Sequence, residues 1–175
     1  MLFRSTSLTG TSLLNGVAFS GFDGLTFGSI QLATAGSSLN SNGSAIQVST
    51  LSGAQNLILA PGIAAGGTDF LGAVSNLGSG IGAALTVSSG ITGQVHFGST
   101  LGTNSGVVAA SGTSLRFDGN VTLGNGNTAT SLTGNSLLNG VAFSGFDGLT
   151  FGSIQLATAG SSDRKSTRLN SSLIP

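Results

Sequence analysis

The sequence predicts an all-β chain folded as a parallel β-helix, or β-solenoid, with coils of about 20 residues. Three observations lead to this prediction: a long, nearly identical repeat, a composition that disfavours helices, and a short Phe-centred unit that recurs along the chain. Such chains are built from similar coils, because a unit too small to bury its own apolar side buries it against its neighbours.

The long repeat joins residues Thr6–Ser38 and Thr130–Ser162. Both copies read TSLTGxSLLNGVAFSGFDGLTFGSIQLATAGSS, where x is Thr11 in the first copy and Asn135 in the second. The offset between the copies is 124 residues (130 − 6). A repeat of this length indicates an array rather than a single globular domain. If six coils fill one period, each coil holds about 21 residues.

The composition favours short strands joined by polar turns. Gly, Ser, Thr and Asn make up about half of the chain, and charged residues only 6%, against roughly 25% in average domains. Glu is absent and Lys occurs once, while each Gly costs a helix about 1 kcal/mol relative to Ala. With 39% hydrophobic residues and no net charge, the chain also differs from ordinary disordered proteins.

Composition also excludes several classes of function. The chain has no cysteine, so it forms no disulfide and no thiolate metal site. Its neutral charge gives no reason to expect nucleic acid as a partner. No run approaches the ~20 apolar residues of a membrane helix, so this segment is not expected to insert into a membrane. Residues 1–4 are too short for a signal peptide, and the signal of an exported parent would lie upstream.

The short unit is an apolar residue, a variable residue and a Phe. Its copies are Val17–Phe19, Leu25–Phe27, Val95–Phe97, Leu115–Phe117, Val141–Phe143, Leu149–Phe151 and, more weakly, Thr68–Phe70. In a strand the first and third residues point to one side and the middle residue to the other. The rings of Phe97, Phe117, Phe143 and Phe151 should therefore be buried. His96 and Arg116 occupy the middle position and should be exposed.

Further strands follow from the same alternation. The candidates are Ile30–Leu32, Ile46–Val48, Leu57–Leu59, Leu85–Val87 and Val121–Leu123. The parity of the apolar positions changes across Gly28 and Ser29, which predicts a corner or a β-bulge there.

The register between coils follows from one spacing, the 20 residues between Phe97 and Phe117. Stacked coils would place Phe97 on Phe117, Leu101 on Val121 and His96 beside Arg116.

Three regions are expected along the chain. Residues 1–5 precede the first repeat unit and are left unassigned. Residues 6–162 form the solenoid, whose second copy begins at residue 130. Residues 163–175 are expected to be a non-native, disordered tail, because DRKSTRLNSS (Asp163–Ser172) resembles the translation of a common sequencing adapter. The basic residues of this tail are therefore not interpreted as a binding site.

Few residues suggest chemistry. His96 is the only histidine, and it is interpreted as an outward residue rather than as a metal ligand or general base, since a metal site needs several ligands. Asp23, Asp118 and Asp147 each precede Gly, as turns favour, and Asp118 is placed to pair with Arg116.

The glycines of Gly78–Gly82 lack the strand and helix of a nucleotide-binding loop and are read as a flexible turn. The sequence thus predicts no catalytic, cofactor-binding or metal-ligating residue, no cofactor and no enzymatic activity.

The Phe-centred units, the Asn/Gly/Ser/Thr turns and stretches such as NVTLGNG (Asn120–Gly126) resemble bacterial β-strand-repeat exoproteins. These include filamentous haemagglutinin-like proteins and the passengers of autotransporter adhesins. The resemblance implies a right-handed parallel β-helix, export across a Gram-negative envelope to the cell surface or medium, and a role as an adhesin rod or stalk. Expected partners are neighbouring repeats of the chain, and a host-surface or polysaccharide ligand.

Two alternatives stay open beside that role. One is a β-helix that binds or cleaves polysaccharide, which predicts stacked aromatics and clustered carboxylates along a groove. The other is a self-associating extracellular fibre, because an open solenoid has two edges able to pair with further strands.

Overall fold

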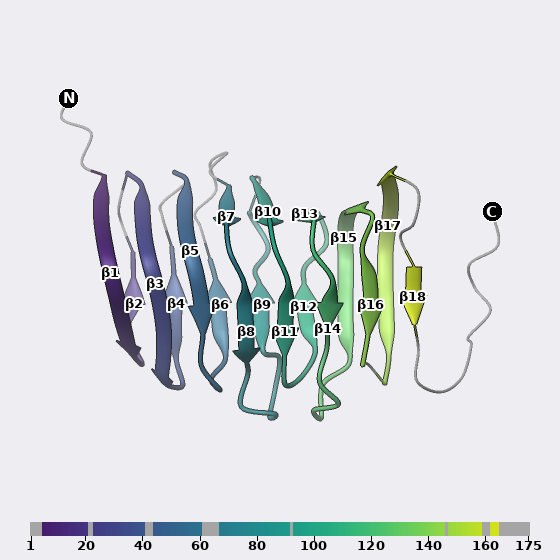
Figure 1. The fold of residues 1–175 in the computed structure, drawn as a ribbon, viewed down its shortest axis with the longest axis horizontal. Coiled ribbons are helices and arrows are strands. Elements are labelled where there is room, and N and C mark those ends of the chain that lie inside the picture. The colour runs from purple at the N-terminus through teal and green to yellow at the C-terminus, as the bar shows by residue number, and fades with distance from the viewer. Residues whose placement is uncertain are drawn as a thin grey trace.

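The structure is a computed structural model that describes residues 5–20, 23–40, 44–60, 67–91, 93–145 and 147–158, and the backbone of residues 162–164. These residues form 18 strands and no helix, and so include no apolar helix able to cross a membrane. All strand pairings are parallel. Successive coils lie side by side from β1 to β17 (Figure 1). The predicted parallel β-solenoid is confirmed.

The strands stack in three ladders. Ladder I consists of the first parts of β1 (Thr6–Asn15), β3 (Leu25–Thr34) and β5 (Ile46–Ser52), then β7 (Thr68–Phe70), β10 (Gln94–Phe97), β13 (Ser114–Phe117) and the last parts of β15 (Thr130–Asn139) and β17 (Leu149–Thr158).

Ladder II consists of the last parts of β1, β3 and β5, then β8 (Val74–Leu77), β11 (Leu101–Thr103), β14 (Val121–Thr122), β16 (Ala142–Ser144) and β18 (Ser162–Arg164).

Ladder III consists of β2 (Ala18–Phe19), β4 (Ser37–Leu39), β6 (Leu57–Leu59), β9 (Leu85–Val87), β12 (Val107–Ala109) and the first parts of β15 and β17. The strands β2, β4, β6, β9 and β12 lie behind ladders I and II in Figure 1.

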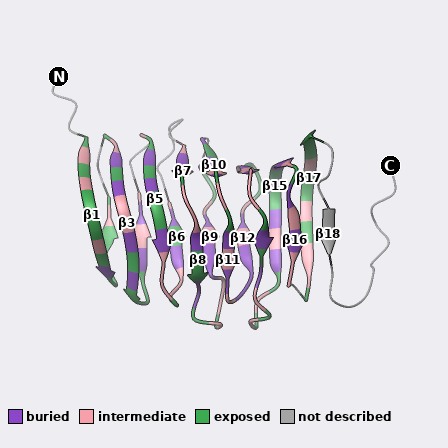
Figure 2. Cartoon of the chain, in the orientation of Figure 1, coloured by how far each residue is buried: buried purple, intermediate pink, exposed green. Residues whose placement is uncertain are grey.

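The core runs along the interior between the ladders. In most strands buried and more exposed residues alternate (Figure 2), and Leu57 and Leu59 flank the exposed Ile58 in this way. Phe97 lies between Phe70 and Phe117, and each of these ring pairs has centroids 5.2 Å apart. The predicted stacking of equivalent residues from coil to coil is therefore confirmed.

The other predicted pairings between coils also hold. Leu101 pairs with Val121 and His96 with Arg116. Phe143 is buried as expected, but Phe151 is only partly buried. Phe151 belongs to β17, the last coil whose side chains the structure describes, and no described strand of ladder III lies beyond it.

The change of parity at Gly28 marks a bulge, as predicted. Leu8 pairs with Phe27 and Thr11 with Ser29, so that Thr9 and Gly10 of β1 oppose the single residue Gly28. A Cβ atom on Gly28 would overlap the carbonyl group of Thr9. The close approach of the two coils therefore requires glycine at this corner.

The two copies of the repeat occupy different ladders. Leu8 lies in ladder I, whereas its counterpart Leu132 lies in ladder III, between Ala109 and Phe151. Leu14 lies in ladder II, and its counterpart Leu138 lies in ladder I on Phe117. Within each copy the pairings and their irregularities are the same.

The second copy is therefore rotated about the solenoid axis by one ladder relative to the first. Along ladder I, six coils lead from Leu8 to Leu138, a distance of 130 residues (138 − 8). One 124-residue period is therefore six coils less one ladder, slightly fewer than the six coils that the sequence suggested.

At the C-terminal side, the backbone pairing of β18 with β16 includes Asp163 and Arg164. These are the first two residues of the tail that was expected to be non-native and disordered. Residues 165–175 of that tail, and residues 1–4 at the other end, lie outside the described part of the chain.

Candidate functional site

A charged cluster lies on the outer side of ladder I. Asp69, His96 and Arg116 occupy the same register position on β7, β10 and β13. Their strand neighbours Phe70, Phe97 and Phe117 point into the core, so the three polar side chains project outward. Three successive coils thus bring together residues that are far apart in the sequence.

His96 bridges two carboxylates. Its Nδ1 lies 2.8 Å from Oδ1 of Asp69, and its Nε2 lies 2.8 Å from Oδ2 of Asp118. An ionised carboxylate can only accept hydrogen bonds, and a neutral imidazole has only one N–H to donate. The doubly protonated ring is therefore the form that satisfies both contacts at once.

Asp118 is the centre of the cluster. Besides His96, it accepts hydrogen bonds from Nε and Nη2 of Arg116 at 3.0 and 2.9 Å, and from Nδ2 of Asn139 at 3.1 Å. The Arg116 hydrogen bonds are the main cause that lowers the pKa of Asp118 to about 2, with those from His96 and Asn139 adding to the effect. The same contact raises the pKa of Arg116.

The cluster corrects one interpretation and confirms another. The Arg116–Asp118 pair forms as expected. The expectation that His96 is exposed is wrong: its side chain is only 26% exposed, because Asp69 and Asp118 flank it. The coil from Phe70 to Phe97 spans 27 residues (97 − 70), and this long coil conceals the register in the sequence. The weak unit Thr68–Phe70 was the signal that could have revealed it.

The geometry limits the chemistry of His96. Both ring nitrogens face carboxylates, so neither is directed at a substrate as a general base would be. Among the residues that the structure describes, no group of three or more His, Cys, Asp or Glu side chains is placed to hold a metal ion. The cluster is suited to joining coils: it connects β7, β10 and β13 with Asn139 at the end of β15.

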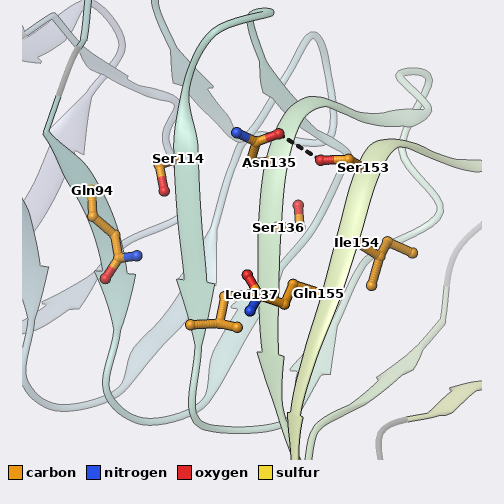
Figure 3. A pocket seen from close by; sticks show the side chains of 8 residues that line it. All are labelled: Gln94, Ser114, Asn135, Ser136, Leu137, Ser153, Ile154 and Gln155. Carbon is orange, nitrogen blue, oxygen red and sulfur yellow. Dashed lines mark hydrogen bonds between the residues drawn. The ribbon is translucent and has the colours of Figure 1, made fainter.

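Two shallow hollows lie along the same side of ladder I. The first, of about 270 Å³, adjoins the cluster and is lined by Gln47, Asp69, Gln94 and His96, among others. The second, of about 390 Å³, is lined by Gln94, Ser114, Asn135, Ser136, Leu137, Ser153, Ile154 and Gln155 (Figure 3). Gln94 lines both, so the two hollows are neighbours.

The remaining candidates lie elsewhere. Asp23 and Asp147 are exposed before β3 and β17 and do not contribute to the cluster. The Gly78–Gly82 segment is tied to neighbouring coils: Nδ2 of Asn56 donates to the Ile81 carbonyl, and the Gly82 amide donates to Oδ1 of Asn127. Three glycines in this segment have positive φ, and the segment holds Ile81 exposed at the surface.

Comparison with protein-family models, with curated proteins and with solved structures finds no match for this chain.

Proposed function

We propose that this chain is a structural and adhesive repeat segment of a large bacterial surface or secreted protein, acting as a stiff rod. The observation that carries the proposal is the continuous inner stack along ladder I. Leu8, Phe27, Val48, Phe70, Phe97, Phe117 and Leu138 follow one another in register. In such a stack each coil is stabilised by its two neighbours, so that stiffness extends along the whole array.

The outer surface supports the same role. The charged side chains of the cluster hydrogen-bond one another. They connect successive coils from the outside, as the Phe rings do from the inside. Ser–Thr and Asn–Ser hydrogen bonds also join coils, for example from Thr50 to Ser29 and from Ser153 to Asn135. A rod reinforced on both sides would resist being pulled apart along its axis.

Single-molecule pulling tests the mechanical part of this proposal. The chain is held at its two ends and extended, and release of successive coils in discrete steps of similar length is expected. The matched variant Phe97→Ala should unfold at lower force, because it interrupts the stack at its centre. Extension without force peaks, as for an unstructured polymer, would contradict a rod function.

Adhesion is tested separately. Beads coated with the chain are applied to cultured epithelial cells and to immobilised matrix proteins, with beads coated with the heat-unfolded chain as the control. Retention of the folded chain alone is expected of an adhesin. Equal retention of both coatings would limit the proposal to a spacer.

A second candidate, a polysaccharide-binding β-helix, is favoured by the hollows on ladder I. The amides of Gln94, Asn135 and Gln155 and the hydroxyls of Ser114 and Ser153 line the larger hollow. Such neutral donors and acceptors match sugar hydroxyl groups. Binding of neutral oligosaccharides that is lost in Gln94→Ala and Gln155→Ala would favour this function. Shortening of the oligosaccharides would instead indicate cleavage.

A further inference from the structure

Ile81 is the most exposed of the large apolar residues that the structure describes, with 72% of its surface accessible. It lies in the loop between β8 and β9. Both of these strands have a paired strand on either side, since β8 lies between β5 and β11 and β9 lies between β6 and β12. The exposure of Ile81 is therefore a property of its own loop within the stack.

The loop exists because this corner of the solenoid is longer than the next one. Leu77 pairs with Thr103 and Leu85 with Val107, so the same corner takes eight steps in one coil (85 − 77) and four in the following coil (107 − 103). The additional residues extend past the ends of the strands, at the lower edge of Figure 1. Ile81 is carried outward by this extension.

The preceding coil holds the loop from one side. Nδ2 of Asn56 donates to the carbonyl of Ile81 at 2.8 Å, and Oδ1 of Asn56 accepts a hydrogen bond from the amide of Ser79 at 3.1 Å. The hydroxyl of Ser79 lies 3.4 Å from the amide of Ile81 and accepts its hydrogen bond. Both backbone polar groups of Ile81 are thus hydrogen-bonded, while its side chain contributes no contact to this network.

The following coils hold the loop from the other side. The amide of Gly82 donates to Oδ1 of Asn127 at 2.9 Å, and the amide of Asn127 donates to the carbonyl of Gly80 at 3.3 Å. The hydroxyl of Ser105 donates to the carbonyl of Gly82 at 2.7 Å. Asn127 follows β14, which is two coils away from β8, so it reaches the loop past the short corner between them.

This network fixes the loop before any partner binds. Gly80 and Gly82, on either side of Ile81, have φ values of 82° and 73°, in the left-handed region that glycine adopts without steric cost. A loop that already has its bound conformation loses little conformational entropy on association. The coils therefore present one aliphatic side chain in a fixed position, as an interface anchor requires.

The surroundings of Ile81 indicate the chemistry of its partner. The segment 78–84 and its hydrogen-bond partners Asn56, Ser105 and Asn127 carry no charge. An aliphatic side chain has no donor or acceptor for a sugar hydroxyl, and one such residue without basic neighbours is too little to anchor a protein to a lipid surface. An apolar centre with a rim of amides and hydroxyls is instead the usual arrangement of a protein–protein contact.

We propose that Ile81 is the residue by which this segment binds a protein on the surface to which it adheres, and that its side chain enters a small, uncharged apolar pocket of that protein. The proposal rests on the adhesive part of the proposed function and assigns adhesion to one loop. Because one side chain is the anchor, each contact is weak, and many copies on one particle act together.

Competition for bead retention measures this contact. Beads coated with the native chain are applied to cultured epithelial cells in the presence of increasing soluble chain. Complete burial of an isoleucine corresponds to roughly a ten- to hundredfold change in affinity. The concentration of soluble Ile81→Ser chain that halves retention should therefore exceed that of the native chain by about this factor.

Two further variants make the measurement specific. Ile58→Ser is the matched control, because Ile58 is another exposed isoleucine but lies on β6, at the outer side of ladder III. It should compete as well as the native chain. Ile81→Val, which keeps most of the apolar surface, should lie between the native chain and Ile81→Ser. All three variants should retain the circular dichroism spectrum of the native chain.

The outcomes distinguish a failure of this proposal from a failure of adhesion. If native beads are retained but Ile81→Ser competes as well as the native chain, Ile81 is not the anchor and adhesion stands. If native beads are retained no better than beads with the heat-unfolded chain, both are overturned. Trypsin treatment of the cells should abolish retention. Retention that survives trypsin, that is lost when glycosidases remove the cell-surface glycans, or that occurs equally on phosphatidylcholine vesicles would overturn a protein partner.

Discussion

Phe97 lies on Phe117 with ring centroids 5.2 Å apart and ring planes 7° from parallel. The two residues are 20 positions apart and occupy the same point of successive coils. Offset-stacked aromatic pairs of this kind contribute about 0.5–1.5 kcal/mol beyond the burial of their surface. The pair shows how a chain with few aromatic residues concentrates them where coil meets coil.

Replacing Phe117 by Ala should strongly destabilise the solenoid. The ring contacts Phe97 on one side and Phe143 on the other, and its removal leaves a cavity between three coils. A cost of about 3–5 kcal/mol in the free energy of unfolding is expected. Urea unfolding followed by circular dichroism measures it. Phe151→Ala in the partly covered last coil is the control and should cost clearly less; equal costs would show that Phe117 is not a central contact.

A Thr68→Val substitution should stabilise the protein. Thr68 is buried, between Ile46 and Val95 in ladder I, and its hydroxyl has no hydrogen-bond partner among the residues that the structure describes. Valine has nearly the same shape and removes a buried unsatisfied group, which costs about 1–3 kcal/mol. The thermal midpoint of the variant should rise. Thr26→Val at an exposed position of β3 is the matched control, and a similar rise in both variants would point to strand propensity instead.

Much of the core could be predicted because its pattern is simple. The Phe-centred units alternate strictly, and the 20-residue spacing between Phe97 and Phe117 reveals the register of these two coils directly. The alternation of apolar residues does not reveal β1, because Thr9 and Gly10 form a bulge that interrupts the alternation of Leu8 with Leu14. Strand β4 was missed because it begins with Ser37, a polar residue that is nevertheless buried.

The sequence does not predict the charged cluster or the rotation of the second repeat copy, for different reasons. Asp69 joins His96 only across a coil of unusual length, which no regular spacing predicts. The rotation of the second copy by one ladder cannot be seen in the sequence, because every ladder has the same alternation of apolar and polar residues. An identical block therefore fits more than one pair of ladders, and the number of residues between the copies determines which pair it occupies.

Acid should weaken the fold through Asp118. Hydrogen bonds, mainly from Arg116, lower the pKa of its carboxyl from an ordinary 3.8 to about 2 in the folded protein. Because the folded pKa is the lower one, the contribution is complete above the unfolded value and is lost as the pH falls through the folded value.

The urea midpoint of the native chain should therefore decline between about pH 4 and pH 2. Asp118→Asn should begin less stable and decline less over this window. Asp23→Asn, at an exposed position of the first repeat copy, provides the comparison. An unchanged pH profile in Asp118→Asn would contradict the role of this carboxylate.

Gly134→Ala and Gly10→Ala form a matched pair of identical substitutions in identical sequence. At Gly134 the new methyl group would overlap the carbonyl of Thr113 in the coil beneath, whereas at Gly10 it would meet no atom within 4 Å. Gly134→Ala should cost roughly 1–3 kcal/mol through overpacking, and Gly10→Ala should change stability little. Urea unfolding of the two variants measures the difference. Equal effects would mean that the second copy does not lie on β13 as described; a larger effect at Gly134 follows only if position in the stack, and not local sequence, determines how closely two coils approach.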